Sequence, residues 1–386
     1  MNRRDFLTAG AAGAGLLSAA LLLSACGPGG GGPEGATLKI GEFASLTGKE
    51  ATFGQSSHNG TELAIRELNA AGGVLGKQLE LITQDNQSKA GESQTVVNKL
   101  IARDGVIAIL GEVASSRSLE AAPVCQNAKI PMISPSSTNP DVTKTGDYIF
   151  RVCFIDPFQG TVMANFAKNT LKAKRVAIFT NVKSDYSKGL AKFFKETHLK
   201  NGGTLAAEFD FNGGDTDFKG QLTAIKAANP EAVFVPGYYT DVALICIQAK
   251  QLGLTVPLFG GDGWESEKLM EIGRDAVEGQ HFSTHYHPDI GSPKSRLFVD
   301  AYRKAYGAAP DAMSALGYDS AMILADAIRR AGSAEPAKIR DALAATKDYD
   351  AVTGRITIDA NRDASKSAVI LRVEGGKLKY LETVAP

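Results

Sequence analysis

Hydroxyl side chains gather at two points where predicted strands end. They are Ser115 and Ser116 after the apolar run 106–110, and Ser136, Ser137 and Thr138 after the run 131–134. Ligands bind at this edge of open α/β sheets. A helix that begins near Ser115 also presents free backbone N–H groups, which attract an anion such as a carboxylate. Serine at this position is equally an ordinary helix N-cap, and the two roles are compatible.

In the second half of the chain, a carboxylate and a tyrosine hydroxyl also lie directly after predicted strands. Asp262 follows the predicted strand 256–259, and Tyr238 follows the predicted strand 232–235. If Asp262 faces the hydroxyl clusters across a cleft, one wall would bind a carboxylate group and the other an ammonium group. The alternative for Asp262 is a turn or a helix cap before Glu265.

Three histidines lie close together in a predicted strand at 281–287. They are His281, His285 and His287, which the alternation of side chains along a strand places on one face. Imidazole is a good zinc ligand, but no Asp, Glu or Cys is interleaved on that face. We therefore expect a solvated or hydrogen-bonded histidine cluster, with no metal and no cofactor.

Catalytic motifs are missing from the sequence. The segment 72–78 resembles part of a phosphate loop, but it lacks the required spacing and precedes a strand, so we interpret it as a turn. No Gly-x-Ser-x-Gly or His-Glu-x-x-His motif occurs, and no nucleophile–base pair is visible. The sequence therefore predicts that the protein is not an enzyme, with an extracytoplasmic hydrolase as the weaker alternative.

Strands and helices alternate along the chain from residue 37. In the first series the predicted strands are 38–43, 78–83, 106–110, 131–134 and 148–154, and the predicted helices are 61–71, 92–103 and 116–126. In the second series the strands are 175–179, 204–209, 232–235 and 256–259, and the helices are 188–199, 218–228 and 241–252. Such alternation predicts parallel sheets with right-handed crossovers.

The last part of the chain must return to the first series. Helices are predicted at 293–306, 313–331 and 336–344, followed by short strands near 356, at 369–373 and at 378–381. These helices must pack against a sheet, and we expect them to pack against the first sheet. The chain then crosses more than once between two lobes, which favours a hinged pair with a cleft. The predicted lobes are 37–156 plus 282–356, and 157–281 plus 357–386.

Length and composition narrow the class of protein. A chain of 386 residues suggests about two domains. Hydrophobic residues make up 44% and charged residues 22%, which is typical of globular proteins and excludes a disordered or collagen-like chain. The formal net charge is +0, which argues against a nucleic-acid partner.

Residues 1–25 have the properties of an export signal. A pair of arginines precedes an uncharged stretch at 6–25, which is followed by Cys26. The Arg-Arg-x-Phe-Leu pattern resembles a twin-arginine signal, and the four residues that end at Cys26 resemble a bacterial lipobox, in which lipid is attached to the cysteine. We expect 26–36 to be the lipidated cysteine and a flexible Gly/Pro tether. A transmembrane helix is the alternative.

Three further cysteines, Cys125, Cys153 and Cys246, match no zinc-binding spacing. Three is an odd number, so at most one disulfide forms within a chain. A Cys125–Cys153 disulfide and three separate buried thiols are both compatible with the sequence.

Five segments in order resemble the Leu/Ile/Val-binding family. They are 111–116, 131–140, 150–154, 237–239 and 315–319. The resemblance runs from about residue 37 to the C-terminus, and it rests on the order and spacing of the segments together. Members are type I extracytoplasmic solute-binding proteins of ABC importers. The resemblance implies an α/β fold with two doubly wound parallel-sheet lobes joined by three crossovers, the type I periplasmic binding protein fold.

The resemblance also implies a set of ligand-binding residues. Positions that hold the α-carboxylate and α-ammonium of an amino acid are matched by Ser115, Ser136 and Thr138, with Tyr238 and Asp262 on the opposite lobe. Positions that line the side-chain pocket are matched by Phe53, Tyr186 and Met313, and Trp264 adds bulk near the cleft. For Phe53 and Met313, ordinary core packing is the alternative.

The implied function is binding and delivery. We expect a monomeric lipoprotein, anchored to a membrane through Cys26 on the extracytoplasmic side, in the periplasm or at the cell surface. It would capture an aliphatic, branched-chain L-amino acid and pass it to the permease subunits of an ABC importer. A same-fold protein for an amide, urea or an aromatic acid is the alternative. The sequence leaves open the exact ligand, the permease and which membrane carries the anchor.

Overall fold

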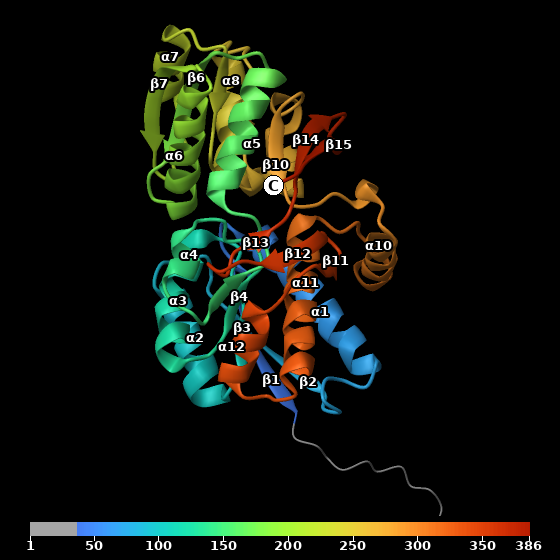
Figure 1. Ribbon diagram of the computed structural model, residues 1–386. Coiled ribbons are helices and arrows are strands. Elements are labelled where there is room, and N and C mark those ends of the chain that lie inside the picture. The colour runs from blue at the N-terminus through green and yellow to red at the C-terminus, as the bar shows by residue number, and fades with distance from the viewer. Residues whose placement is uncertain (1–36) are drawn as a thin grey trace, which may run out of the picture. The chain divides into compact units, whose positions relative to one another are not determined.

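The computed structural model describes residues 37–386, so the predicted signal 1–25, the lipidated Cys26 and the tether 26–36 lie outside the described residues. None of the helices within 37–386 is both long and apolar enough to cross a membrane. The first part of the chain forms a five-stranded parallel sheet of order β2-β1-β3-β4-β5 (Figure 1). Its strands are β1 (Leu38–Ala44), β2 (Leu79–Asp85), β3 (Ala108–Leu110), β4 (Met132–Ser134) and β5 (Ile149–Arg151).

A seven-stranded sheet of order β15-β14-β10-β9-β8-β6-β7 follows. Its strands are β6 (Arg175–Asn181), β7 (Thr204–Phe211), β8 (Ala232–Phe234), β9 (Leu258–Gly260), β10 (His281–Thr284), β14 (Ala368–Glu374) and β15 (Lys377–Val384). The predicted parallel pairing holds from β7 to β10, but β14 and β15 run antiparallel at one edge. Gly375 and Gly376, both with positive φ, form the two-residue turn that reverses the chain there.

The helices agree with the predicted pattern in order and mostly in extent. They are α1 (Ala51–Ala70), α2 (Glu92–Lys99, extended by a π-helical turn at Leu100–Asp104), α3 (Ser115–Ala128), α4 (Asp141–Lys144), α5 (Asp156–Asn169), α6 (Asp185–Lys200), α7 (Lys219–Ala227), α8 (Tyr239–Gln251), α9 (Glu267–Gly273), α10 (Pro293–Tyr306), α11 (Ala312–Ala331) and α12 (Pro336–Ala344). Three helices were not predicted. Helices α4 and α9 are too short to show a periodic pattern. Helix α5 was missed although Phe158, Val162 and Phe166 recur four apart and pack in one cluster.

Helix α1 begins ten residues before its predicted start at residue 61. Its first half contains glycines and small polar residues, which are weak helix formers. The structure shows why two glycines are there. A Cβ atom on Gly60 would lie 1.8 Å from the carbonyl oxygen of Ser314 on α11, and one on Gly54 would lie 2.1 Å from the carbonyl oxygen of Ser45. These positions let α1 lie directly against its neighbours, and packing makes the segment helical despite its low propensity.

A small third sheet extends the first part of the fold. It contains β11 (Tyr349–Ala351), β12 (Gly354–Ile358) and β13 (Ala364–Ser365). Ile358 and Ala364 pack in the same hydrophobic cluster as residues of β1, β3 and α11. The chain therefore stays beside the first sheet beyond residue 356, the predicted boundary, and joins the second sheet only at β14.

We call the five-stranded sheet, the small sheet and helices α1–α4 and α10–α12 the first lobe, and the seven-stranded sheet with α5–α9 the second lobe. Two hydrophobic clusters fill each lobe. Phe53, Val113 and Met313 belong to the first lobe by chain position, yet they pack in one cluster with Tyr239 and Trp264 of the second lobe. The two lobes are thus closed against each other.

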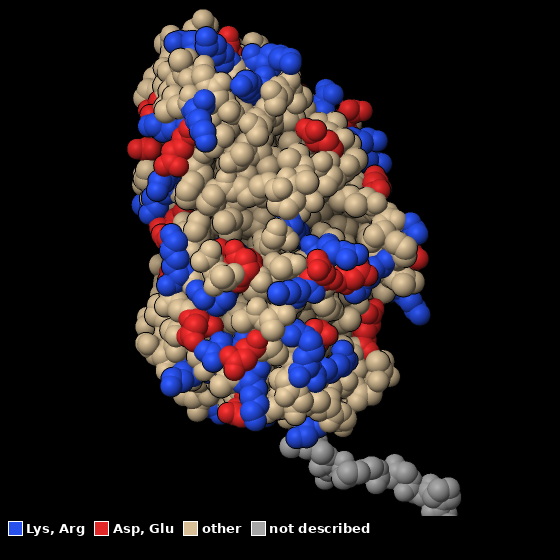
Figure 2. Space-filling view, viewed as in Figure 1, with Lys and Arg blue, Asp and Glu red and all other residues tan. Residues whose placement is uncertain are grey.

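Of the two alternatives for the cysteines, the structure shows separate buried thiols. Cys125, Cys153 and Cys246 are free and buried, so the Cys125–Cys153 disulfide is not formed. On the face drawn in Figure 2, Lys and Arg side chains are interspersed with Asp and Glu, in keeping with a net charge of +0.

Candidate functional site

The predicted hydroxyl residues lie at the carboxyl-terminal edge of the first sheet. Ser115 is the first residue of α3, and Ser136 and Thr138 lie in the loop after β4. All three are buried. The Oγ of Ser115 accepts a hydrogen bond from the backbone N–H of Asn139 at 3.3 Å, which joins the two hydroxyl segments. The Oγ1 of Thr138 is buried and makes no hydrogen bond within the described part of the chain.

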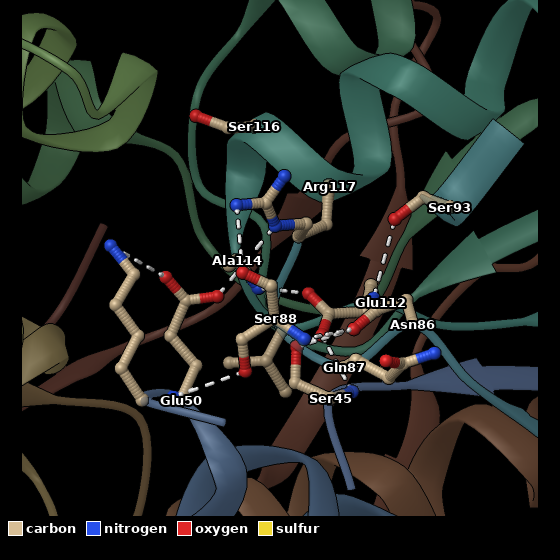
Figure 3. Close-up of polar contacts among 12 residues, drawn as sticks. Ser45, Glu50, Asn86, Gln87, Ser88, Ser93, Glu112, Ala114, Ser116 and Arg117 are labelled. Atoms are coloured by element: carbon tan, nitrogen blue, oxygen red, sulfur yellow. Dashed lines mark hydrogen bonds and ion pairs between the residues drawn. The ribbon is translucent and has the colours of Figure 1, made fainter. Parts of the chain in front are cut away.

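Glu112 holds the loop that presents Ser115 (Figure 3). One carboxylate oxygen accepts hydrogen bonds from the backbone N–H and hydroxyl of Ser45, at 2.9 and 2.5 Å, and the other accepts from the N–H of Ala114 at 2.7 Å. Ala114 directly precedes α3. Burial raises the pKa of Glu112 to about 7, with the charge of Glu50 adding to the effect and these donors opposing it. Sequence reasoning did not assign Glu112 a role, although a lone glutamate in a buried strand-to-helix turn was a usable signal.

Not every hydroxyl in these loops faces a ligand site. Ser134 and Ser137 both donate to the carbonyl oxygen of Glu112, at 2.7 and 2.9 Å. Ser118 donates to the same oxygen at 3.2 Å. These serines therefore build the loop, whereas Ser115, Ser136 and Thr138 remain on the side toward the second lobe.

Asp262 reaches the hydroxyl cluster from the second lobe. It begins a 3₁₀ turn (Asp262–Trp264) after β9 and is buried. One carboxylate oxygen accepts from the Nε2 of Gln159 on α5 at 2.8 Å. The other lies 3.0 Å from the Nε2 of His285 and 3.5 Å from the Oγ of Ser136, a first-lobe residue. The structure thus brings together Asp262 and Ser136, as the split-site hypothesis requires, and adds Gln159 and His285, which sequence reasoning did not place there.

The predicted histidine cluster does not form. Strand β10 ends at Thr284, so His285 and His287 lie beyond it and do not share a face with His281. His285 is fully buried, stacks on Phe154 with ring centroids 3.8 Å apart, and pairs with Asp262, while the other two are half-buried. Burial lowers the pKa of His285, and the neighbouring Asp262 opposes that shift. Among residues 37–386, no group of three or more His, Cys, Asp or Glu side chains is placed to hold a metal ion.

Aromatic rings form a wall beside the polar residues. Tyr186 and Tyr238 are stacked, with centroids 5.2 Å apart and planes 5° apart, and the ring of Phe53 meets Tyr238 edge-on at 5.5 Å. The hydroxyl of Tyr186 accepts from the N–H of Gly263 at 3.1 Å. Met313, near the start of α11, is buried in the same cluster as Phe53. First-lobe and second-lobe residues therefore share one largely apolar surface.

Trp264 lies deeper than predicted. It is fully buried, and its indole N–H donates to the carbonyl oxygen of Val235 at 2.8 Å. Its ring packs 6.1 Å from that of Phe282 on β10. These contacts anchor the turn that carries Asp262, and they hold the indole within the second lobe rather than among the hydroxyls.

Several buried polar atoms at the junction of the lobes have no hydrogen-bond partner among the described residues. They are the Oγ1 of Thr138, both carboxyl oxygens of Asp156 and the Oε1 of Gln159. Asp156 begins α5, and its N–H donates to the carbonyl oxygen of Thr138 at 2.9 Å. Burial raises the pKa of Asp156 well above its usual range, the neighbouring Thr138 hydroxyl opposes the shift, and the charge of Asp262 adds to it. Buried polar groups are normally satisfied, so this cluster is suited to contact with a polar ligand.

Hydrogen bonds between the lobes surround these residues. The hydroxyl of Ser116 donates to a carboxylate oxygen of Asp185 and accepts from the N–H of the same residue, both at 3.0 Å. The side-chain amide of Asn139 donates to the carbonyl oxygen of Asp185 at 2.7 Å. On another side, the hydroxyls of Thr52 and Ser266 lie 2.9 Å apart. These contacts join α1 and α3 of the first lobe to α6 of the second lobe and to Ser266, the N-cap residue of α9.

Comparison with known proteins identifies the family. The family described as "Periplasmic binding protein" matches residues 37–377, which is most of the chain. The chain belongs to the periplasmic binding protein family. The resemblance to this fold found in the sequence is therefore confirmed.

Individual members of the periplasmic binding protein family agree along nearly their whole length. The leucine-, isoleucine-, valine-, threonine- and alanine-binding protein of Pseudomonas aeruginosa is 32% identical over 330 residues, covering 85% of this chain and 87% of that protein. The crystal structure of a leucine binding protein from Thermotoga maritima has 42% identity and a TM-score of 0.88, covering 91% of this chain and 99% of that one. A branched-chain amino acid transporter substrate binding protein from Streptococcus pneumoniae, solved with isoleucine, has 36% identity and a TM-score of 0.86, covering 91% and 100%.

Proposed function

We propose that this protein captures an aliphatic, branched-chain L-amino acid between its lobes and delivers it to an ABC importer. The observation that carries the proposal is the set of unpartnered buried polar atoms beside an aromatic wall where the lobes meet. The names of the relatives support it, because the proteins from Pseudomonas aeruginosa, Thermotoga maritima and Streptococcus pneumoniae are described as binding leucine or its branched-chain relatives.

The carboxylate of the ligand would bind at the start of α3. The first N–H groups of a helix have no partner within the helix, and the helix dipole favours a negative charge there. Ser115 adds a hydroxyl at this point, and Glu112 fixes the preceding residue, Ala114, through its N–H. The site therefore needs no basic side chain to hold the carboxylate.

The ammonium group would bind between Asp262 and Thr138. A buried charge must find several partners to offset its loss of hydration. Asp262 supplies a carboxylate from the second lobe, and Thr138 supplies an unpartnered hydroxyl oxygen from the first. Because the two acceptors belong to different lobes, only the closed arrangement satisfies the ammonium group, and the ligand favours closure.

The apolar part of the ligand would contact Phe53, Tyr186, Tyr238 and Met313. These side chains present ring faces and a thioether, with no charged group among them. Such a surface favours an aliphatic side chain over a charged one.

A thermal-shift screen tests the ligand assignment. The purified protein is unfolded and refolded to remove any bound ligand, and is then heated with each common L-amino acid. A ligand at a hundred times its Kd stabilises the fold by about 2.7 kcal/mol, which is readily detected. We expect stabilisation by leucine, isoleucine and valine, and none by D-leucine, urea or acetamide. Stabilisation by benzoate or an amide, with none by any amino acid, would leave the family assignment intact and refute the ligand.

We also propose that a lipid on Cys26, which lies outside the described residues, anchors the protein. An acylated cysteine would hold the protein on the extracytoplasmic face of a membrane, within reach of permease subunits. In cell fractionation, the native chain should sediment with membranes, and Cys26→Ser should not carry lipid. Unchanged mass and distribution in Cys26→Ser would contradict lipid attachment.

A further inference from the structure

A cavity lies where the chain passes between the lobes. Of the residues discussed above, only His285 borders it. Its volume is about 370 Å³. It is bordered by the segment that leaves β10 and by the segment between β13 and β14, elements that meet near the middle of Figure 1. We call it the hinge pocket, defined by His285, Ser292, Thr353, Arg355, Lys366 and Ser367.

Lys366 is the unusual residue of the hinge pocket. It is only 3% exposed, and its ammonium group donates one hydrogen bond, to the Oγ1 of Thr353. Within residues 37–386, no ion pair joins this ammonium group to a carboxylate, and Asp319 is the carboxylate whose charge acts on it. Asp319 accepts hydrogen bonds from the N–H groups of Val352 and Thr353 and from the hydroxyl of Thr353, which also accepts from Lys366. Two of the three ammonium donors of Lys366 thus have no partner among the described residues.

The electrostatics of Lys366 are consistent with this unpaired position. Burial lowers the pKa of its ammonium group to about 8, although the charge of Asp319 opposes the shift. The group is still mainly cationic at neutral pH. An unpaired buried charge is unfavourable, so a compensating anion would gain both an ion pair and hydrogen bonds.

The rest of the lining is suited to the same ligand class. Arg355 adds a second cation at the exposed rim, and Ser292 and Ser367 contribute hydroxyls. The Nδ1 of His285, which is buried, also has no hydrogen-bond partner among the described residues. No Asp or Glu side chain is among the described residues that line the pocket. The last residue, Pro386, also lines it, but its terminal carboxylate forms no ion pair with Lys366. A pocket with two cations, several hydroxyls and no carboxylate side chain favours an anion.

We propose that the hinge pocket binds a small oxyanion, a carboxylate or phosphate group, with Lys366 as its ion-pair partner. The bound anion contacts segments that leave both β10 and β13, so it ties together two of the connections between the lobes. This site meets the amino-acid site only at His285, whose Nε2 pairs with Asp262, and it does not depend on the identity of the ligand bound there.

Calorimetric titration with sodium phosphate and with sodium acetate, at constant ionic strength, tests the proposal. We expect saturable binding of at least one of these oxyanions, weakened about tenfold or more in Lys366→Met, which corresponds to about 1.4 kcal/mol. Lys366→Arg should retain most of the affinity. Lys377→Met, on the exposed strand β15, serves as the matched control and should bind as the native protein does. The two titrations distinguish a phosphate from a carboxylate.

Two further readouts keep the proposal testable if Lys366→Met does not fold. Ion pairing raises the pKa of Lys366, so binding at pH 8 should take up protons, and the measured heat should vary with the ionisation enthalpy of the buffer. Arg355→Gln should weaken binding without abolishing it.

Three results would overturn the proposal. The first is the absence of saturable binding of either anion to the native protein. The second is equal binding by the native protein and Lys366→Met. The third is loss of binding in Ser115→Ala, which would place the anion at the start of α3 instead of in the hinge pocket.

Discussion

Asp262 is oriented by its neighbours on both lobes. Gln159 donates to one carboxylate oxygen, and His285 and Ser136 lie at the other. A carboxylate fixed in this way loses little conformational freedom when a ligand binds, which favours affinity. In the proposed function its charge is the main partner of the ligand ammonium group.

Replacing Asp262 should weaken amino-acid binding strongly. Removing one partner of a buried charge pair typically costs about 3–5 kcal/mol, because the other charge is left buried and unpaired. We expect Asp262→Ala to raise the Kd of the preferred amino acid by a factor on the order of hundreds to thousands, measured by calorimetry. Asp275→Ala is the matched control, since the Asp275 side chain is 83% exposed. Unchanged affinity in Asp262→Ala would exclude Asp262 from the binding site.

Glu112 should make the stability of the protein depend on pH. Its pKa of about 7 in the folded state is above the 4.5 of an ordinary glutamate, so the folded state binds this proton more tightly than the unfolded chain does. The stability gained from the protonated form is complete below about pH 4.5 and is lost as the pH rises through about 7. At about 1.4 kcal/mol per pKa unit, the loss is about 3 kcal/mol.

Urea unfolding between pH 4.5 and 8 measures this effect. Glu112→Gln should remove that part of the decline in the free energy of unfolding, whereas Glu80→Gln, at an exposed position on β2, should retain it. The comparison isolates Glu112 from other groups with raised pKa values, such as Glu265. Parallel pH profiles for the native protein and Glu112→Gln would contradict the prediction.

At the scale of elements, the packing of α1 on α11 depends on glycine. Besides Gly60, a Cβ atom on Gly317 of α11 would lie 2.2 Å from the carbonyl oxygen of Ser57 on α1. Both contacts involve backbone atoms, which cannot move aside as a flexible side chain can. The two helices therefore approach each other through small residues, and this contact supports Phe53 and Met313 near the starts of α1 and α11.

Alanine substitutions test this packing. Gly60→Ala should destabilise the protein by about 1–3 kcal/mol, the usual range for overpacking, although alanine is the better helix former. Gly220→Ala on α7 is the control, because a Cβ atom there meets nothing within 4 Å, and it should stabilise the protein by up to about 1 kcal/mol. Thermal and urea unfolding measure both effects. A stabilised Gly60→Ala variant would show that α1 and α11 can move slightly apart without a loss of stability, which would contradict the prediction.

At the scale of the whole molecule, closure brings together the starts of two helices. Ser116 at the start of α3 and Asp185 at the start of α6 make two mutual hydrogen bonds between the lobes. Both lie next to the hydroxyl cluster, so these bonds would hold the lobes together while a ligand is bound. Their contribution belongs to the closed arrangement, not to either lobe alone.

Removing this contact should speed ligand release. Each hydrogen bond contributes about 0.5–1.5 kcal/mol, so Ser116→Ala should weaken binding several-fold to about a hundredfold, mainly through a faster dissociation rate. The melting temperature of the ligand-free protein should change little. Thr223→Ala on α7 is the control, and stopped-flow dissociation is the measurement. An unchanged dissociation rate in Ser116→Ala would show that closure does not use this contact.

Much of the fold could be predicted from the sequence, because the relevant signals are local. Apolar runs of strand length alternate with helical patterns, and the helices α10 and α12 have the predicted bounds. The same reasoning placed hydroxyls after β3 and β4 and a carboxylate after β9, since parallel strands end at one edge of a sheet. The N-terminal part of α1 was missed, because its glycines are explained only by contact with α11 and with Ser45, which follows β1.

Local patterns in the sequence were sufficient to predict the α/β alternation, the return of the last helices to the first sheet, and the polar residues at the strand ends. The three-dimensional packing was needed to show that Asp262 pairs with His285 and Gln159, that Glu112 holds the loop before Ser115, and that Trp264 points into the second lobe. It also decided that Lys366 is buried without a carboxylate partner. These arrangements depend on contacts between residues distant in the chain, and local patterns of polarity carry no information about which distant groups will meet.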